Sequence, residues 1–433
     1  MLYTFYGDDF TGSTDVLEQL ASNGVPTALF LRLPDADQLA RFKDIEALGI
    51  AGDSRSRSPE WMAANLPRIF AAMKQFNAPI NHYKVCSTFD SSPTHGSIGR
   101  AIELGREVFS PEFIPVVVAA PHLGRYVVFS NLFAVCPDGT IQRIDRHPMA
   151  QHPVTPMHEA DLCRHLAAQT KLAMGQVDLT AIQSGCAVTE LDRQLAEGRQ
   201  VIFFDGVDPT SIATTGELLW QRALERSIFS ASSSGLTAAI VSAWRKSGIT
   251  GETLSPAPAN NKSEPLLIIS GSCSTVTANQ IRHALENGSR SISIDPCRFP
   301  GSLNSELERV RDAAATSLAD HHDVVLHTAL GASSGMASGD ALGRALGHLL
   351  RDLLAMVRTR RVVLCGGDTS SHALEQLDLY ALTWAASIQP GAPLCRAWSE
   401  DPSLDGLELV LKGGQTGTPD FFEAVRTHNS MRA

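Results

Sequence analysis

The sequence predicts an α/β fold in two domains, each a mostly parallel β-sheet flanked by helices. At 433 residues the chain is too long for one ordinary hydrophobic core. Short apolar runs typical of buried strands alternate with stretches of helical periodicity. Residues 251–264 have the composition of a linker and no periodicity, which divides the chain into an N-terminal domain at 1–250 and a C-terminal domain at 265–433.

The composition excludes several classes of protein. With 43% hydrophobic and 19% charged residues the chain is neither disordered nor membrane-spanning, and a formal net charge of −10 opposes binding to nucleic acid or to an anionic membrane. The eight cysteines form no CxxC pair, which favours reduced thiols. The first residues lack the pattern of a secretory signal, so we expect a soluble, cytoplasmic protein. We leave a homodimer open, because it is the commonest soluble assembly.

The N-terminal stretch is expected to carry a site. Leu2–Tyr6 reads as a strand, the loop GDDFTG follows it directly, and a helix begins behind the loop with Thr11 or Ser13 as its N-cap. Ligands of open α/β sheets bind at such carboxyl ends of strands. There Asp8 and Asp9 can hold a metal or accept a proton from a hydroxyl. Alternatively, they only cap the helix and solvate the turn.

Two arginines follow a later strand of the same domain. Strands are predicted at Val25–Leu31 and at 47–52, and a helix is predicted from Pro59 to about Phe76. Arg55 and Arg57 stand among serines between the second of these strands and the helix. Guanidinium groups at a strand end suit a carboxylate or a phosphate, which arginine can bind with two hydrogen bonds. Solvated surface arginines are the alternative.

A lysine and several hydroxyls follow the next predicted strand. Ile80–Val85 reads as that strand, Cys86–Ser91 forms a polar loop, and a helix begins after a further turn. Lys84 with the hydroxyls of Ser87 and Thr88 could bind a small polyhydroxylated acid. The hydroxyls could equally be ordinary turn and capping residues.

The remainder of the N-terminal domain contains more strands and one unusual loop. Strands are predicted at Ile114–Ala120, Tyr126–Val135 and Val201–Asp205, the last being the final clear strand of this half, and Ser230–Gly235 is predicted to be a turn that starts a helix. The proline- and histidine-rich segment Asp138–Met157 is expected to be a functional flap. Its histidines precede prolines, which gives extended geometry rather than the helical pairing of metal ligands, so the metal ligands stay unknown.

The C-terminal domain repeats the pattern of strand, small-residue loop and helix. Strands at Leu266–Ser270, Arg361–Cys365 and Leu407–Lys412 end in the loops GSCST, GGDTS and GGQTG, and further strands are predicted at Ser291–Asp295 and Val324–Thr328. Glycine-rich loops at helix N-termini let backbone N–H groups approach phosphates, so three of them favour a nucleotide site. None has the spacing of a P-loop or of the dinucleotide-binding fingerprint.

Together these motifs resemble the four-carbon acid sugar kinases, which are ATP-dependent enzymes. The resemblance runs almost end to end. The matching segments are Gly7–Asp15, Ser54–Arg55, Lys84–Asp90, 152–157, 233–236, 271–274, 366–370 and 412–417. Gln415 and Thr416 depart from the Asn-Phe of the family pattern, which puts the packing of adenine or ribose there in doubt.

The resemblance implies that the N-terminal domain binds the sugar acid, that the C-terminal domain binds ATP with Mg²⁺, and that the active site lies in the cleft between the domains. The candidate catalytic residues carried over by position are Asp8 and Asp9. The candidate substrate-binding residues are Asp9, Arg55, Lys84, Cys86, Ser87 and Thr88. The candidate nucleotide-binding residues are Ser272, Gly366, Gly367, Asp368, Thr369 and Gly414.

The implied activity is transfer of the γ-phosphoryl group of ATP to the terminal hydroxyl of a short sugar acid. Arg55 with Lys84 would fix the substrate carboxylate, and Asp8 or Asp9 would accept the hydroxyl proton. Cys86 stands where the threonate and erythronate kinases carry aspartate, which favours a 3-oxo acid, first 3-oxo-tetronate. The alternatives are 3-oxo-isoapionate, threonate and erythronate.

Two rival functions remain at this stage. One is a sugar-acid sensor that keeps both domains without turnover, against which the acidic pair and the Gly-Gly-Asp-Thr loop argue. The other is an aldolase or decarboxylase with a divalent metal. That enzyme would need clustered histidines and carboxylates, which the sequence does not show clearly.

Overall fold

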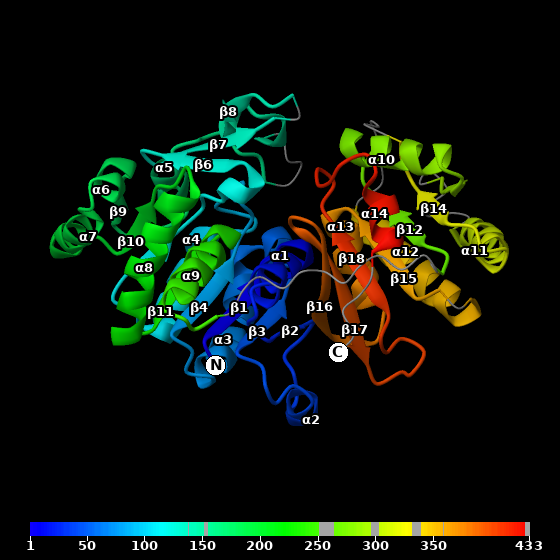
Figure 1. Ribbon diagram of the computed structural model, residues 1–433, viewed down its shortest axis with the longest axis horizontal. Helices are drawn as coiled ribbons and strands as arrows, with labels where there is room; N and C mark the ends of the chain where they lie inside the picture. The colour runs from blue at the N-terminus through cyan, green and yellow to red at the C-terminus, as the bar shows by residue number, and fades with distance from the viewer. Residues whose placement is uncertain are drawn as a thin grey trace. The chain divides into compact units, whose positions relative to one another are not determined.

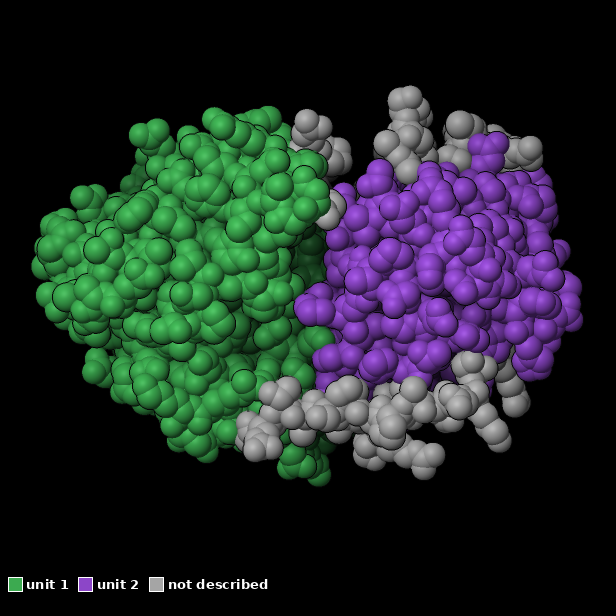
Figure 2. Space-filling model, turned by 45° about the horizontal axis from the view of Figure 1, so that its top comes forward, with its two compact units in different colours: residues 1–28, 35–254 green, residues 29–34, 255–433 purple. Residues whose placement is uncertain are grey.

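The chain forms two compact units. The computed structural model describes residues 1–136, 138–150, 155–250, 264–295, 303–330, 339–357 and 359–428. Unit 1 comprises residues 1–28 and 35–254, and unit 2 comprises residues 29–34 and 255–433, coloured green and purple in Figure 2. Apart from Glu264, the predicted linker at 251–264 lies outside the described residues.

The main sheet of unit 1 is parallel. Its strands follow the order β11-β4-β1-β3-β2, and the β11–β4, β4–β1 and β1–β3 pairs are all parallel (Figure 1). The strands are β1 Tyr3–Gly7, β2 Thr27–Phe30, β3 Ala47–Ala51, β4 Ile80–Lys84 and β11 Ile228–Ser232. Every residue of these five strands is buried, as expected for a parallel sheet covered on both faces.

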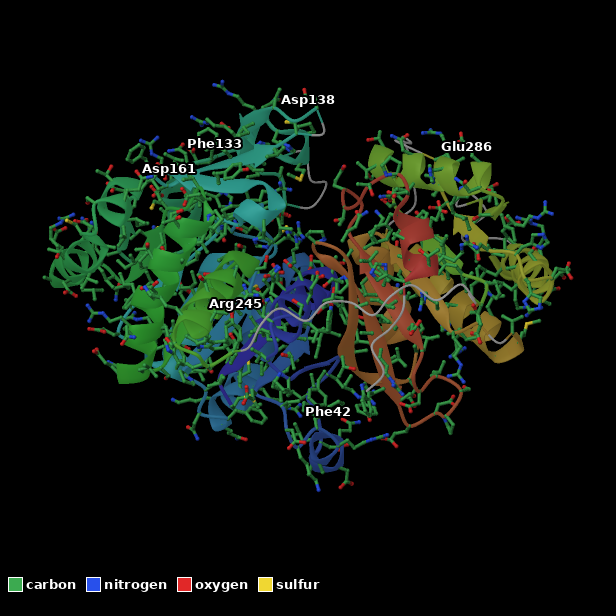
Figure 3. All side chains as sticks on the ribbon, viewed as in Figure 1. Phe42, Phe133, Asp138, Asp161, Arg245 and Glu286 are labelled. Atoms are coloured by element: carbon green, nitrogen blue, oxygen red, sulfur yellow. The ribbon has the colours of Figure 1, made fainter. Side chains whose placement is uncertain are left out.

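Two smaller sheets complete unit 1. One is parallel with the order β5-β10-β9, and the other is an antiparallel meander with the order β6-β7-β8. The strands are β5 Ile114–Val116, β6 Arg125–Val128, β7 Asn131–Val135, β8 Ile141–Arg143, β9 Met174–Val177 and β10 Val201–Phe204. Asp138 lies at the turn between β7 and β8 (Figure 3).

Helices of unit 1 connect these strands. They are α1 Phe10–Ala21, α2 Ala36–Ala40, α3 Pro59–Gln75, α4 Ile98–Phe109, α5 Leu162–Ala167, α6 Leu179–Gln183, α7 Ala187–Ala196, α8 Pro209–Glu225 and α9 Ser234–Lys246, with 3₁₀ turns η1 Ser54–Ser56, η2 Pro121–Leu123, η3 Ile144–Arg146 and η4 Pro148–Ala150. Pro59 occupies the first position of α3, as predicted, because its missing N–H would have no helical partner there.

Unit 2 contains a mixed sheet. Its strands are β12 Leu267–Ser270, β13 Arg290–Ser293, β14 Val324–His327, β15 Arg361–Cys365, β16 Leu379–Gln389, β17 Ala392–Ser399 and β18 Glu408–Lys412, in the order β16-β17-β18-β15-β12-β14-β13. The five strands from β18 to β13 are parallel. The pairs β16–β17 and β17–β18 are antiparallel, and Leu29 and Phe30 pair antiparallel with β16.

The helices of unit 2 cover this sheet. They are α10 Thr275–Glu286, α11 Leu303–Ala319, α12 Gly339–Met356, α13 Gly367–Glu375 and α14 Phe421–Thr427. A buried cluster joins β12, β15, β17, β18 and α14, and it includes Ile268, Val363, Leu394, Val410 and Phe421. Among the described residues no helix is long and apolar enough to cross a membrane.

One predicted strand proved to be a hairpin. Tyr126–Val135 was expected to run as one strand, but β6 and β7 pair antiparallel around Phe129 and Ser130, which both adopt left-handed φ angles of 48° and 61°. The turn depends on Asp205, a residue far along the chain. The Asp205 carboxylate accepts the backbone N–H groups of Phe129 and Ser130 at 2.6 and 3.0 Å, which fixes a turn that neither residue favours locally.

The prediction that Val201–Asp205 is the final strand of this half was also wrong. β11 follows it, and Ser230 and Ser232, predicted to lie in a turn, belong to this buried strand. Their side chains have partners there, because Ser230 Oγ donates to Pro115 O at 2.8 Å and Ser232 Oγ accepts from Val117 N at 2.8 Å. A serine-rich sequence can therefore form a core strand where its hydroxyls bind a neighbouring backbone.

Candidate functional site

The candidate acid-binding residues of unit 1 lie at one edge of its main sheet. Gly7, the last residue of β1, pairs with Ala51 of β3 and with Lys84 of β4, so the carboxyl ends of three strands are adjacent. Two backbone hydrogen bonds continue this arrangement beyond the strands. Asp8 N donates to Lys84 O at 2.9 Å, and Arg55 N donates to Asp8 O at 3.1 Å. Three separate stretches of sequence are thereby brought together.

Asp9 is the N-cap of α1. Its Oδ1 accepts the N–H of Gly12, so the prediction of Thr11 or Ser13 as the cap was wrong. The reason is that the helix begins at Phe10, which puts Asp9 in the extended conformation of a cap residue. Ser13 Oγ instead donates to Asp9 O at 2.6 Å. Asp9 thus caps the helix, which the sequence analysis gave as an alternative to a catalytic role, and it also forms an ion pair with Arg55.

Arg55 lies between two carboxylates. Its Nη1 is 2.9 Å from Asp9 Oδ2, and its Nη2 contacts both oxygens of Asp90 at 2.8 and 2.6 Å. Asp90 is buried, and the hydroxyls of Thr88 and Thr155 also donate to it. Charge-assisted hydrogen bonds of this kind are short and strong, so the group is held in one geometry. The Nε of Arg55 is buried without a partner.

Asp8 has a different environment from its neighbour. It is buried, and its Oδ1 has no hydrogen-bond partner. Burial and then the charge of Asp9 raise the pKa of Asp8 to about 8, against opposing contributions from Arg55 and Lys84. The two adjacent carboxyl groups therefore differ in state: Asp9 pairs with arginine, whereas Asp8 is largely protonated at neutral pH. Such a difference is typical of catalytic acids and bases.

Lys84 supplies a buried cation to this cluster. It is 3% exposed, and no hydrogen bond or ion pair of its ammonium group occurs within the part of the chain that the structure describes. A Cβ added at Gly12 would lie 2.8 Å from Lys84 Nζ and 2.6 Å from Asp9 Oδ1. The ammonium group therefore lies against the first turn of α1, beside the acidic pair, and glycine at position 12 leaves it that room.

The remaining predicted acid-binding residues follow β4. Cys86 and Ser87 are partly exposed, whereas Thr88 is buried and bound to Asp90. Arg57, in contrast, pairs with Asp53, four residues before it, and lies over the ring of Trp61 at 5.3 Å.

Sequence reasoning did not select four polar residues of this region. Asp90 and Thr155 lie in segments that carried the family resemblance, and the pairing of Asp90 with Arg55 and with Thr155 could have been suspected from those segments only. Asp15 Oδ1 and Arg125 Nε are buried without partners, as Asp8 Oδ1 is. Burial of an unpaired polar atom is costly, so these atoms mark a region built to take a polar ligand. No local sequence signal distinguishes Arg125.

The predicted nucleotide-binding loops of unit 2 also converge. Ser270 pairs with Cys365 and Cys365 pairs with Lys412, which makes the carboxyl ends of β12, β15 and β18 adjacent. Gly271 N donates to Cys365 O at 3.2 Å and Gly366 N to Lys412 O at 2.9 Å. Helices α10 and α13 begin at two of these loops, so their unpaired N–H groups lie at the same edge.

The loops approach one another too closely for larger residues. A Cβ added at Gly271 would lie 2.2 Å from Thr369 Oγ1, and one at Gly414 would lie 2.8 Å from Ser272 Oγ. Gly366 has a φ angle of 112°, which side chains rarely adopt, and its added Cβ would lie 3.6 Å from Ser272 N. The backbone around this edge is therefore accessible because these positions lack side chains.

Two further features complete this edge of unit 2. An added Cβ at Gly367 would meet nothing within 4 Å, so the first turn of α13 faces open space there. Lys412 is fully buried, and its Nζ donates to Thr277 Oγ1 at 3.1 Å, Gly413 O at 2.9 Å and Thr416 O at 3.1 Å. Asp368 belongs to α13, and its side chain lies outside the described part.

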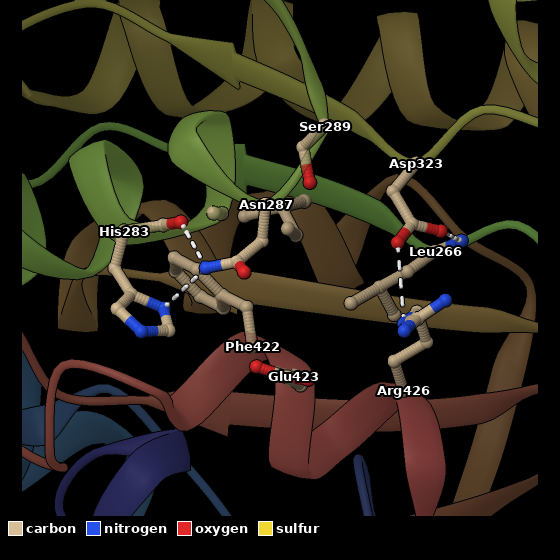
Figure 4. A pocket seen from close by; sticks show the side chains of 10 residues that line it. Leu266, His283, Asn287, Ser289, Asp323, Phe422, Glu423 and Arg426 are labelled. Atoms are coloured by element: carbon tan, nitrogen blue, oxygen red, sulfur yellow. Dashed lines mark hydrogen bonds and ion pairs between the residues drawn. The ribbon is translucent and has the colours of Figure 1, made fainter.

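A small pocket of unit 2 lies elsewhere. Figure 4 shows its lining residues, which include His283, Asn287, Asp323 and Arg426. Asp323 precedes β14 and pairs with Arg426 at 3.6 Å. The pocket is thus at the amino ends of the strands, whereas ligands of α/β sheets bind at the carboxyl ends. We assign no role to it in the chemistry.

The histidines of the Asp138–Met157 segment divide into two cases. His147 Nε2 donates to Val135 O at 3.3 Å and its Nδ1 accepts from Met149 N at 3.1 Å, so both ring nitrogens bind backbone. His152 lies outside the described residues. Within the described ranges no group of three His, Cys, Asp or Glu side chains could hold a metal ion. The functional flap stays a prediction.

Comparison with known proteins assigns both halves of the chain. Residues 3–240 match a family described as the sugar-binding N-terminal domain, and residues 267–422 match one described as the nucleotide-binding C-terminal domain. The chain is 43% identical to a 3-oxo-isoapionate kinase of Paraburkholderia graminis, over 98% of this chain and 94% of the relative. It is 31% identical to a 3-oxo-tetronate kinase of Pectobacterium atrosepticum, over 96% of each chain.

Two solved structures share the fold. A protein of Salmonella typhimurium LT2 superposes with a TM-score of 0.77 at 23% identity, and a protein of Haemophilus influenzae superposes with a TM-score of 0.71 at 22% identity. Each comparison covers 98% of both chains. The two-unit α/β architecture is therefore a shared one.

The environment of Asp8 predicts a pH-dependent stability. Its folded-state pKa of about 8 exceeds the ordinary value of 3.8, so the folded chain holds a proton that the unfolded chain releases. The contribution of this proton to the free energy of unfolding is complete below about pH 4 and is lost as the pH rises towards 8. Asp8→Asn removes it. The melting temperature of Asp8→Asn relative to the wild type should therefore rise by about 4 °C or more between pH 5 and pH 8.5.

Calorimetric melting of both chains at each pH measures this difference. Asp44→Asn, at an exposed position of the same unit, is the matched control and should shift the melting temperature equally at both pH values. A constant difference between Asp8→Asn and the wild type would contradict the raised pKa.

Proposed function

Because the chain belongs to the four-carbon acid sugar kinase family, we propose that it transfers the γ-phosphoryl group of ATP to the terminal hydroxyl of a short 3-oxo sugar acid. The protein is a sugar acid kinase, as its two domains and its curated relatives agree. The observation that carries the choice of acid is the 43% identity to a 3-oxo-isoapionate kinase, against 31% to a 3-oxo-tetronate kinase. We therefore put the branched 3-oxo-isoapionate first and the linear 3-oxo-tetronate second.

The residues of unit 1 are proposed to hold the sugar acid. Arg55 keeps Asp9 and Asp90 in place, and its unpartnered Nε can donate to a substrate oxygen. Lys84 adds a positive charge at the same sheet edge. Cys86 and Ser87 are partly exposed beside it and can contact the carbon chain of the acid. A site of this kind positions the reacting hydroxyl, which is the main requirement of phosphoryl transfer.

Asp8 is the better candidate for the general base. Asp9 already accepts from Gly12 N and pairs with Arg55, whereas Asp8 has an unpartnered oxygen. A base is most effective when its pKa lies near the working pH, and the pKa of Asp8 is about 8. We propose that Asp8 Oδ1 accepts the proton of the attacking hydroxyl, while Asp9 holds the cation that orients it.

The loops of unit 2 are proposed to bind the nucleotide. ATP supplies the phosphoryl group, and Mg²⁺ bound with it neutralises phosphate charge. Backbone N–H groups of the loops at Ser272 and Gly366–Thr369 suit the phosphates, because helices α10 and α13 begin there, and the Gly414 loop lies beside Ser272. Magnesium keeps several waters and needs only one or two carboxylates beside the phosphates, so we propose that it enters with the nucleotide. The placement of the active site between the domains stays a prediction.

A substrate panel tests the proposed function. Release of ADP is followed with 3-oxo-isoapionate, 3-oxo-tetronate, threonate and erythronate, each at several concentrations. We expect kcat/KM to be highest for 3-oxo-isoapionate. A preference for 3-oxo-tetronate would overturn the first choice, and a preference for a 3-hydroxy acid would overturn the 3-oxo assignment. Binding of an acid and ATP without any turnover would favour the sensor.

Replacement of the two aspartates should separate their roles. Asp8→Asn should lower kcat by roughly 10²-fold or more, the usual scale of a general base, with the KM for ATP little changed. Asp9→Asn keeps an oxygen for the helix cap and loses the charge that pairs with Arg55, so it should raise the KM for the acid more than it lowers kcat.

The pH profile gives a second readout of the same roles. In the wild type, kcat/KM should rise about tenfold per pH unit below pH 8 and level off above it, because only the ionised Asp8 accepts a proton. Asp8→Asn should lack this limb. Near-normal turnover and an unchanged profile in Asp8→Asn would assign the base elsewhere.

Substitution at Gly367 should block the nucleotide site selectively. Since an added Cβ there meets no protein atom within 4 Å, Gly367→Val should fold and project its side chain over the first turn of α13. ATP binding by calorimetry should weaken by about tenfold or more while binding of the sugar acid is unchanged, because valine keeps phosphate away from the backbone N–H groups. Gly367→Ala should have a smaller effect. Equal ATP affinity in all three chains would move the nucleotide site elsewhere.

A further inference from the structure

We propose that Arg125, together with Lys84, binds the carboxylate of the sugar acid. This inference rests on the proposed function, and it concerns a residue that neither the sequence motifs nor the comparisons select. Arg125 is the first residue of β6, in the small antiparallel sheet of unit 1.

The charge of Arg55 is already matched. Its two terminal nitrogens contact Asp9 and Asp90, and each carboxylate brings one negative charge. An incoming carboxylate bound by Arg55 would add a third negative charge around this one guanidinium group. Carboxylates that share one guanidinium group repel one another strongly when water is excluded. Arg55 can orient the acid through Nε, but the countercharge for its carboxylate has to come from other residues.

Arg125 is a cation with neutral neighbours. Its Nη1 donates to Leu123 O at 2.8 Å and to Gly124 O at 3.2 Å, and its Nη2 lies 3.4 Å from Met149 Sδ. Its Nε is buried without a partner. Across the described ranges it has no ion pair with a carboxylate. A partly buried guanidinium that pairs with no acid in its own unit is suited to an anionic ligand.

The backbone connects Arg125 to the sheet edge that carries Lys84 and Cys86. Val85 N donates to Ser232 O at 2.8 Å, and Ser232 Oγ accepts from Val117 N at 2.8 Å. Three residues beyond Val117, Ala120 exchanges two hydrogen bonds with Arg125, at 3.0 and 3.1 Å. Arg125 is thus attached, through the segment that continues β5, to the residues that follow β4.

Electrostatic neighbours agree with this placement. The Cys86 thiol is within electrostatic range of both Arg55 and Arg125. His122, in the 3₁₀ turn just before Arg125, is within range of Lys84 and Asp15. Lys84, two residues before Cys86, and Arg125 are therefore both near this thiol, at a position that the sequence links to substrate choice. Two cations beside a partly exposed thiol can give a carboxylate the countercharge that Arg55, already paired with Asp9 and Asp90, does not supply.

A purely structural role for Arg125 makes a different prediction. Its bonds to Leu123 O and Gly124 O could serve only to hold the turn before β6. In that case its replacement would disturb all ligands of unit 1 alike. A carboxylate-binding role instead predicts a loss that depends on the charge of the ligand, and that difference decides the experiment.

The experiment compares Arg125→Gln with the wild type on the acid and on its neutral carboxamide. Glutamine can still donate to one carbonyl of the turn. We expect the KM for the acid to rise roughly 10- to 100-fold, the scale of a lost charge-assisted contact, with kcat and the KM for ATP within about threefold of the wild type. The preference for acid over carboxamide should fall by the same factor. Arg125→Lys should restore part of it.

Arg143→Gln is the matched control. Arg143 lies on β8 of the same small sheet and pairs with Asp145, so its loss should leave the KM for the acid unchanged. An unchanged preference for acid over carboxamide in Arg125→Gln overturns the inference, as does an equal loss for both ligands. If the wild type phosphorylates neither ligand, the proposed function fails and this inference fails with it. If the wild type turns over the acid and Arg125→Gln behaves like the wild type, the inference about Arg125 fails and the proposed function stands.

Discussion

Arg55 joins Asp9 and the buried Asp90 in unit 1, and the geometry of the candidate site in this unit depends on this group. Removing the arginine would leave the buried carboxylate of Asp90 without its cation, which typically costs several kcal/mol. The Asp9 carboxylate of this group also lies beside Asp8. Burial is the first cause of the raised pKa of Asp8, and the neighbouring Asp9 is the second.

In both units the loops that follow parallel strands meet at one edge of the sheet, but the residues at that edge differ between the units. Parallel strands bring loops that are far apart in sequence to a single edge, so residues after β1, β3 and β4 meet in unit 1 and residues after β12, β15 and β18 meet in unit 2. Unit 1 fills its edge with charged side chains. Unit 2 leaves its edge to backbone, with glycines where a Cβ would collide with Ser272 or Thr369. Charged side chains suit a small acid, and bare N–H groups suit phosphates.

Much of this arrangement could be predicted from the sequence, because it follows from local patterns. The strands before Asp8, Arg55, Ser272 and Gly366 are short, mostly apolar runs that end in polar or glycine-rich loops, and the structure confirms these strands. Parallel pairing then brings their ends together. The roles of the residues at those ends stay predictions, since they depend on ligands.

The rest could not be predicted, because it depends on contacts between distant residues. The turn at Phe129 and Ser130 exists because of Asp205, which lies about 75 residues further along the chain, so the β6–β7 hairpin was predicted as one strand and Arg125 was missed. The pKa of Asp8 follows from burial, which the acidic doublet does not reveal. The antiparallel β16–β17 pair was likewise not predicted, although β16 opens with the buried apolar run Leu379–Leu382.

Lys412 extends the electrostatic argument to unit 2. It is fully buried, its three donors bind Thr277 Oγ1 and two carbonyl oxygens, and no carboxylate in the described part of the chain pairs with it. Neutral acceptors satisfy its hydrogen bonds and leave its charge unbalanced, and burial lowers its pKa accordingly. Two carbonyl oxygens of the loop at 413–416 accept from this ammonium group, so Lys412 holds the loop that carries Gly414. Although the chain has a formal net charge of −10, each unit thus keeps a buried lysine that pairs with no carboxylate among the described residues, Lys84 in one unit and Lys412 in the other.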